Sequence, residues 1–210
     1  KLAHTNAALT IVCNPNAPSG SFISVDELAS LADELSGVLL VDEAYVDFAE
    51  GNCMELVKKF DNVMILRSLS KGYSLAGIRF GYVIAQSDLI KGLMKVKDSY
   101  NVDAVAIAAA TAAIKDQKYF SETTEKVKKA RGFLIEQLRD LKFEVPQSFS
   151  NFVLARSKNS QASEIFGKLK EQNIYVRYFD LPGLDDKLRI TVGTDEQNNK
   201  LISALKEILS

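Results

Sequence analysis

Lys71 lies in a segment where a lysine is an unusual choice. It falls between two apolar runs, 63–66 and 80–85, which predict buried strands. The segment itself contains Leu75 and Ile78, so we expect it to be buried rather than to form a surface loop. Burial disfavours the ammonium form of a lysine and leaves a nucleophilic amine that can form a Schiff base. The simpler interpretation is a lysine whose stem packs on the protein while its amine reaches solvent.

The same segment also carries groups that suit an anion. Ser68 and Ser70 supply two hydroxyl donors, and Arg79 follows Lys71 by eight residues. A guanidinium matches a phosphate bidentately, whereas pairing with a surface carboxylate is the ordinary role of an arginine. An amine together with an anion-binding group is what pyridoxal 5'-phosphate requires, because its aldehyde and its phosphate lie on one ring.

A second motif upstream supports a cofactor. The run 38–41 predicts a buried strand of the parallel type, and Asp42 stands at its carboxyl end. Ligands of open α/β sheets bind at that end of the strands. A carboxylate there can pair with a protonated pyridine nitrogen, and Tyr45 can donate to the ring oxygen. An ordinary capping role for Asp42 is the alternative, but the two motifs together favour the cofactor.

These motifs resemble the fold-type I, class I/II aminotransferases, and most closely the histidinol-phosphate aminotransferase family. The resemblance is carried by Asp42–Tyr45, Ser68–Lys71 and Ala76–Tyr82, and it runs from Asn14–Gly20 to Leu188–Thr194. It implies an α/β fold: a mostly parallel sheet in a large domain that binds pyridoxal 5'-phosphate, and a smaller α+β C-terminal domain. It also implies a homodimer with active sites at the interface.

The resemblance implies a role for each cofactor residue. Lys71 is the catalytic residue, which holds the cofactor and then moves the proton between the substrate Cα and the cofactor C4′. Asp42 keeps the pyridine nitrogen protonated, and Tyr45 contacts the ring oxygen. The phosphate is expected to bind Ser68, Ser70 and Arg79.

One cofactor contact departs from the family pattern. The turn Asn14–Gly20 has Ala17 where the family carries the asparagine that contacts the ring oxygen. Asn16 is the candidate replacement, with Asn14 as the alternative. Turn formation alone also explains the asparagine and proline residues of this segment.

Three residues of the C-terminal part are candidates for substrate binding. Arg189 lies in an otherwise apolar strand, where its donors need either an anion or a structural salt bridge, and the pattern does not separate the two. The resemblance implies that Arg189 binds the substrate carboxylate, Arg177 binds the substrate phosphate, and Asn151 contacts the carboxylate. The implied reaction converts imidazole acetol phosphate and L-glutamate to L-histidinol phosphate and 2-oxoglutarate, in histidine biosynthesis.

Other functions remain open. One is a different fold-type I enzyme, such as an aromatic aminotransferase or a threonine-phosphate decarboxylase. Another is a non-catalytic ligand-binding module with this fold, and a third is an incomplete, inactive piece. The family's phosphate-binding glycine-rich loop and its stacking aromatic would precede Lys1, so we expect the chain to be N-terminally incomplete.

Composition sets the remaining bounds. The 210 residues are 47% hydrophobic with a net charge of −1, which favours neither a nucleic-acid nor a membrane partner. Cys13, Cys53 and the single His4 do not form a metal-binding pattern, and a reduced, cytoplasmic setting is expected.

A change in composition near residue 116 predicts two domains. Residues 1–116 are expected to form the C-terminal part of the large cofactor-binding domain, and residues 117–210 the small α+β domain. The alanine-rich stretch 102–114 is apolar nearly all round, which predicts a buried or interface helix.

Overall fold

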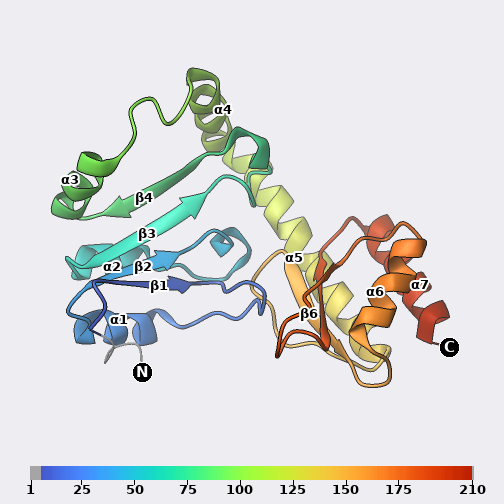
Figure 1. The fold of residues 1–210 in the computed structure, drawn as a ribbon. Helices are drawn as coiled ribbons and strands as arrows, with labels where there is room; N and C mark the ends of the chain where they lie inside the picture. Colours follow the sequence, from blue (N-terminus) through green and yellow to red (C-terminus); the bar gives the residue numbers. More distant parts are fainter. Residues whose placement is uncertain (1–5, 210) are drawn as a thin grey trace. The chain divides into compact units, whose positions relative to one another are not determined.

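The computed structural model describes residues 6–209, so His4 lies outside the described part. The chain divides into two compact units (Figure 1). The first contains residues up to Asn16 and Phe22–Thr123, and the second contains Ala17–Ser21 and the residues from Thr124 onward. The division falls inside α5 (Gln117–Asp140), the helix that starts at the predicted domain boundary. Each unit has its own sheet and its own apolar core.

The first unit is built on a mixed, mostly parallel sheet. Its strands follow chain order: β1 (Leu9–Cys13), β2 (Val38–Asp42), β3 (Val63–Ser68) and β4 (Gly81–Ala85). The first three are parallel, and β4 runs antiparallel to β3. Parallel neighbours need a crossover connection, which helix α1 (Val25–Glu34) supplies between β1 and β2. The predicted α/β class and its mostly parallel sheet are confirmed.

Helix α1 begins at a capping box. The Ser24 hydroxyl accepts a hydrogen bond from the backbone N–H of Glu27, and the Glu27 carboxylate accepts one from the Ser24 N–H. Leu28 and Ala32, four residues apart, are its buried residues. They join a core that includes Leu39, Val41, Val63 and Ile65 of the strands and Leu56 of helix α2 (Met54–Lys59).

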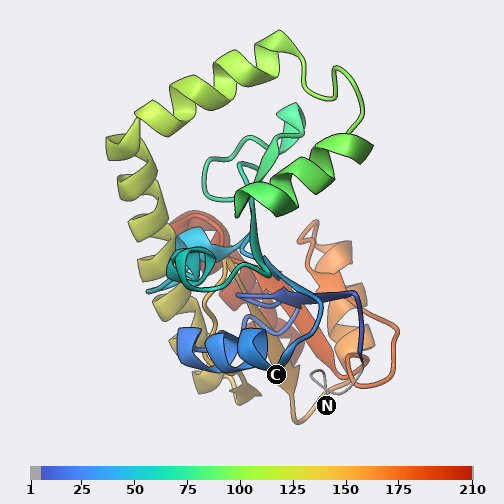
Figure 2. The same cartoon turned by 90° about the vertical axis from the view of Figure 1, so that its left-hand side faces the viewer.

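Two further helices of this unit bury little surface. Helix α3 (Ser87–Val96) has no buried residue, and helix α4 (Ala104–Lys115) buries only Ala106 and Ala110. Both views show α4 lying away from the strands of this sheet (Figures 1 and 2). The prediction of a buried helix is therefore wrong within residues 6–209, because an all-round apolar helix packs through one narrow stripe of alanines. The interface alternative stays a prediction.

The second unit is an antiparallel sheet with helices. Its strand order is β5 (Phe143–Glu144), β6 (Phe152–Ser157), β8 (Lys187–Thr191) and β7 (Arg177–Tyr178). Helices α6 (Ala162–Glu171) and α7 (Asp195–Leu209) pack with the second half of α5 against it. Strand β7 is short, because its pairing with β8 starts only at Arg177.

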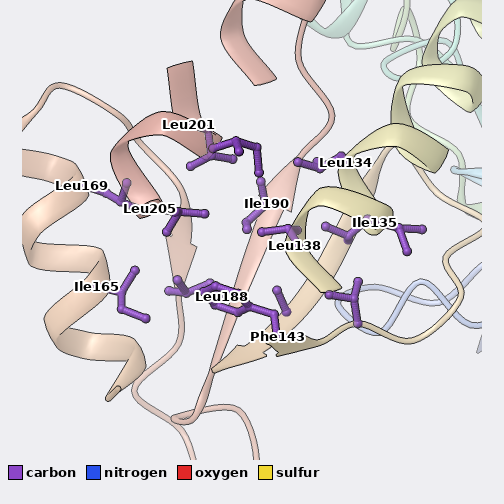
Figure 3. Close-up of a cluster of buried hydrophobic side chains, with 14 of the residues drawn as sticks. Leu134, Ile135, Leu138, Phe143, Ile165, Leu169, Leu188, Ile190, Leu201 and Leu205 are labelled. Carbon is purple, nitrogen blue, oxygen red and sulfur yellow. The ribbon is translucent and has the colours of Figure 1, made fainter. Parts of the chain in front are cut away.

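The core of this unit holds β6 and β8 in place. Leu134 and Leu138 of α5, Leu205 of α7 and Leu188 of β8 are at most 1% exposed and pack as one cluster (Figure 3). Leu188 and Ile190 alternate along β8 with Arg189, whose side chain therefore leaves the opposite face of the sheet. The core thus fixes the position of Arg189, a candidate substrate-binding residue, within strand β8.

Candidate functional site

Asp42 is the last residue of β2, as predicted, and pairs with Cys13 of β1. Its Oδ1 accepts a hydrogen bond of 2.9 Å from the backbone N–H of Ala44, and its Oδ2 lies 3.9 Å from the Cys13 Sγ. A thiol is a weak donor, so Oδ2 keeps acceptor capacity for a stronger one. Asp42 therefore presents a carboxylate oxygen at the carboxyl end of the sheet.

Cys13 is a neighbour of this carboxylate that the sequence analysis did not single out. Burial raises the pKa of its thiol, and the adjacent Asp42 charge and hydrogen bond raise it further. The thiol consequently remains protonated and can donate to Asp42 rather than repel it. The sequence contains both residues at the ends of two strands. Their contact can be recognised only once these strands are known to pair side by side.

Lys71 and Tyr45 are brought together. The Lys71 Nζ lies over the Tyr45 ring, 5.1 Å from its centroid, close enough for a cation–π contact. The strand ends before these residues are also adjacent, because the backbone N–H of Glu43 donates to the Leu66 oxygen at 2.8 Å. The amine predicted to react and the phenol predicted to contact the cofactor ring thus share one edge of the sheet.

The segment around Lys71 is only half-buried, which corrects the expected burial. Lys71, Leu75 and Ile78 are all of intermediate exposure, and Leu69 is the fully buried residue of the segment. The reason is the path of the backbone: the loop closes on itself, with the N–H groups of Leu69 and Leu75 donating to the Phe80 and Leu69 oxygens. One side chain anchors the loop, and the rest stay near its surface.

Two residues of this loop have left-handed backbone conformations. Ser74 has φ 56° and Arg79 has φ 54°. Non-glycine residues adopt such angles rarely and at a cost, and they cluster at functional sites. The loop's closing hydrogen bonds hold both residues in these conformations.

The predicted phosphate contacts are only partly assembled. The Ser68 hydroxyl accepts a hydrogen bond of 3.1 Å from the Ser70 N–H, which places both residues at the end of β3. Arg79 is exposed, and its Nη1 donates to the Ala76 oxygen at 2.9 Å. Within residues 6–209 no hydrogen bond joins Arg79 to either serine. The two serines are grouped, whereas the guanidinium is held by its own loop.

The structure separates the two asparagine candidates. Asn14 is fully buried, its Oδ1 accepts from the Ile23 N–H at 2.8 Å, and its Nδ2 donates to the Ile23 oxygen at 2.9 Å. Its amide is therefore committed to holding the backbone at Ile23. Asn16 is half-buried and remains the candidate for the ring-oxygen contact.

Glu43 has a structural role that was not predicted from the sequence. Its side chain is buried, and its Oε2 accepts from Arg67 Nε at 2.9 Å and from Nη2 at 2.7 Å. Its Oε1 accepts from the Cys53 backbone N–H. This buried pair ties the turn after β2 to strand β3, and so stabilises the strand ends that carry Asp42 and Ser68.

In the second unit Arg177 and Arg189 are direct partners across β7 and β8. Both guanidiniums stack on one ring, since the carbon Cζ of Arg177 lies 5.2 Å from the Phe179 centroid and that of Arg189 lies 5.7 Å from it. Arg189 also lies 5.1 Å from the Phe152 centroid. Phe179 was missed from sequence, although its place two residues after Arg177 on an extended segment put it on the same face.

Arg189 has an unmet donor. Its Nε is buried and has no hydrogen-bond partner within residues 6–209, and the described part of the chain offers it no carboxylate. The structural salt bridge considered from sequence is thus not found there. An unpaired buried guanidinium nitrogen is costly, which favours an anion as its partner.

Asn151 immediately precedes β6 and is half-buried. Its backbone oxygen accepts from the Val192 N–H at 2.9 Å, which continues the pairing of β6 with β8. This hydrogen bond fixes the Asn151 backbone opposite Val192, beyond the end of β8, whereas Arg189 within β8 pairs with Leu154.

In this chain the loop that contains Lys71 follows strand β3, and strand β2 ends with the acid Asp42. A known class of proteins shares this arrangement and this fold. The family model of aminotransferase class I and II matches residues 1–205, and the chain belongs to this family. It is 50% identical over 209 residues to "Histidinol-phosphate aminotransferase 1" of Trichormus variabilis, covering 100% of this chain and 60% of that protein. It is 47% identical to a histidinol-phosphate aminotransferase of Rhodopirellula baltica, covering 90% and 52%.

Solved structures agree with the family. Histidinol-phosphate aminotransferase from Sinorhizobium meliloti, in complex with pyridoxal-5'-phosphate, matches with a TM-score of 0.90 and 28% identity, over 99% of this chain and 59% of that one. L-threonine-O-3-phosphate decarboxylase from Porphyromonas gingivalis matches with a TM-score of 0.87 and 29% identity, over 98% and 65%. The resemblance inferred from the motifs is confirmed. The chain spans about 60% of the length of the histidinol-phosphate aminotransferases of Trichormus variabilis and Nostoc sp. that it matches.

Proposed function

We propose that the protein containing this chain is a pyridoxal 5'-phosphate-dependent aminotransferase that acts on histidinol phosphate. The observation that carries the proposal is the Lys71 amine over the Tyr45 ring, beside the strand end that presents Asp42. The 50% identity to a histidinol-phosphate aminotransferase supports the same substrate. The reaction is the exchange of an amino group between L-glutamate and imidazole acetol phosphate.

The side chains of the candidate site suit the groups of pyridoxal 5'-phosphate. The free acceptor capacity on Asp42 Oδ2 suits a protonated pyridine nitrogen, and the Tyr45 phenol suits the neighbouring ring oxygen. The Ser68 and Ser70 hydroxyls are proposed as donors for the phosphate, because the two residues are close to each other at the end of β3. Lys71 supplies the amine that the cofactor's aldehyde requires.

Pyridoxal 5'-phosphate supplies an electron sink that stabilises negative charge at the substrate Cα. Lys71 would hold the cofactor through its side-chain amine, and the free amine would serve as the base that moves the proton from the substrate Cα. Asp42 maintains the positive charge on the pyridine nitrogen. Asn16, Tyr45 and Arg79 complete the cofactor contacts.

The second unit supplies the anion contacts of the substrate. The orphaned Nε of Arg189 suits the α-carboxylate, and Arg177 suits the substrate phosphate. Both guanidiniums lie over the Phe179 ring, so Arg177 and Arg189 present two cationic groups on one surface. Asn151 is proposed to add an amide contact to the carboxylate. L-glutamate would use the carboxylate contact, whereas imidazole acetol phosphate has a phosphate and no carboxylate. A phosphate contact at Arg177 favours this phosphorylated substrate over an aromatic amino acid.

The protein is also proposed to be a cytoplasmic homodimer. Val105 is 77% exposed and Ile107 is 50% exposed on α4, which favours a protein partner for this helix. Within residues 6–209 no helix has both the length and the apolar character needed to cross a membrane. Cell fractionation tests the location.

The central test replaces the amine. Lys71→Ala in the full-length protein should abolish transamination and the absorbance of the covalently linked cofactor, because no other group forms the covalent link. Lys91→Ala is the matched control, since Lys91 is an exposed lysine paired with Asp88. A Lys71→Ala variant that keeps both properties contradicts the proposal. Assays with imidazole acetol phosphate, phenylpyruvate and threonine phosphate distinguish the aminotransferase from its decarboxylase and aromatic relatives.

A further inference from the structure

Asp47 lies against the residue that follows Lys71. It belongs to the short 3-10 helix η2 (Val46–Phe48), and its carboxylate accepts a hydrogen bond from the backbone N–H of Gly72. A Cβ at position 72 would lie 2.3 Å from the Asp47 Oδ2 and 2.7 Å from the Asp47 Cβ. Gly72 is itself buried, so a side chain at position 72 would have no room. The contact therefore requires a glycine at position 72, because a larger residue would collide with Asp47.

The same helix holds Lys71 from a second side. Tyr45 is the N-cap residue of η2, and its ring lies under the Lys71 amine at 5.1 Å. Tyr45 and Asp47 therefore contact the two ends of one short stretch, the amine of Lys71 and the amide of Gly72. The helix is positioned to fix both the backbone and the side chain of the lysine.

Charged and titratable groups of three other segments face Asp47. Arg67 of β3 and Glu43 after β2 form the buried ion pair, and Tyr82 of β4 lies beside Arg67, to which it is paired through the strand register with β3. Burial is the main reason that the pKa of the Asp47 carboxyl is raised to about 6; Arg67 and the Gly72 N–H oppose this rise, and the Glu43 charge adds to it. The carboxyl thus changes charge close to neutral pH.

We propose that Asp47 is a positioning residue for Lys71, which it fixes through the Gly72 amide. It acts on the backbone and does not touch substrate or cofactor. The inference rests on the proposed role of Lys71, and it adds a residue to which neither the motifs nor the resemblance assigned a role.

The hydrogen bond should strengthen as pH rises through about 6, because a carboxylate is a stronger acceptor than a carboxylic acid. Global stability should change in the opposite sense. A carboxyl whose pKa is raised in the folded protein binds its proton more tightly there, so its contribution is most favourable at low pH and is lost between about 4 and about 6. The local and the global effects can therefore be told apart by their pH dependence.

The first test measures amide hydrogen exchange by mass spectrometry in the full-length protein, with and without pyridoxal 5'-phosphate. Asp47→Ala should speed exchange in peptides covering 69–74 by about tenfold or more, the factor expected for a lost hydrogen bond of ordinary strength. Peptides from β1 and β2 should be unchanged. Asp47→Asn should restore part of the protection, since its amide oxygen can accept the Gly72 N–H. Asp33→Ala, an exposed aspartate of α1, is the control.

The second test is a double-variant cycle. Gly72→Ala should displace Asp47 and lower cofactor affinity, and the effect should be smaller in a protein that already carries Asp47→Ala, because the contact is lost once. Additive effects overturn the proposal, as does unchanged exchange in Asp47→Ala or an equal rise in every peptide. Exchange without cofactor tests the contact itself, and cofactor affinity tests its consequence for Lys71. A failure of the proposed function would leave the first result intact.

Discussion

At the scale of residues, two consecutive acids have opposite environments. Asp42 is half-buried at the sheet edge, and Glu43 is 1% exposed and paired with Arg67. The alternation of side chains along an extended chain sends neighbours to opposite faces, so one acid serves the site and the other the scaffold. The same separation explains why only Asp42 has acceptor capacity left for a ligand.

Glu43→Gln should lower the free energy of unfolding by about 2–4 kcal/mol, because it leaves the guanidinium of Arg67 part-buried without its counter-ion. Urea denaturation measures the change. Glu55→Gln is the control: Glu55 and Lys58 form an exposed pair, whose loss should change the free energy of unfolding much less. Equal effects of the two substitutions would show that the buried pair has no special weight.

Arg189→Lys should raise the KM for L-glutamate by about 10-fold to 100-fold, with a smaller change in kcat, because a lysine cannot form the two parallel hydrogen bonds of a guanidinium. Steady-state kinetics measures the split. Arg156→Lys in the same unit changes an exposed arginine paired with Asp186 and should leave KM within about twofold. An unchanged KM in Arg189→Lys would rule out the carboxylate contact.

At the scale of elements, short local signals place the strands and helices that hold the site. The capping box fixes the start of α1, and this helix makes the crossover that lets β1 and β2 run in parallel. Parallel β2 and β3 then bring Asp42 and Ser68 to the same edge. The loop that carries Lys71 is positioned in turn by η2 and by the buried Leu69.

Ser24→Ala should cost about 1 kcal/mol of unfolding free energy, since it removes the hydroxyl that accepts the Glu27 N–H. Ser30→Ala is the matched control, because the Ser30 hydroxyl bonds the Asp26 oxygen inside the exposed helix, where alanine is tolerated or slightly favourable. Thermal unfolding of both variants checks the prediction. A cost for Ser30→Ala as large as that for Ser24→Ala would mean that the cap is not the cause.

At the scale of the whole molecule, each unit has a core of its own, and helix α4 carries exposed apolar residues that belong to neither core. In α4 the exposed residues Val105, Ile107 and Ile114 flank the alanines that pack inward. Exposed apolar side chains gathered on one helix are typical of a surface that contacts another chain. This is the surface that the proposed homodimer would use.

Replacing Val105 and Ile107 together with glutamate should shift the full-length protein from dimer to monomer, because two charges would be desolvated at an apolar contact. Light scattering coupled to size-exclusion chromatography measures the mass. Lys200→Glu, on the exposed face of α7, is the control and should leave the mass unchanged. A dimer that persists in the double variant would place the interface elsewhere.

The sequence alone predicted the family and a mostly parallel α/β sheet, and it indicated Asp42 and Lys71 as candidate site residues, because these depend on local periodicity and short motifs. Only the tertiary structure showed the Glu43–Arg67 pair, the Cys13 thiol beside Asp42, the Phe179 ring beneath two arginines and the contact of Asp47 with Gly72. It also showed that the segment around Lys71 is half-buried and that Arg79 is held by its own loop. Most of these contacts join residues far apart in the chain, and whether two such side chains meet depends on strand register and loop path, which no local pattern encodes.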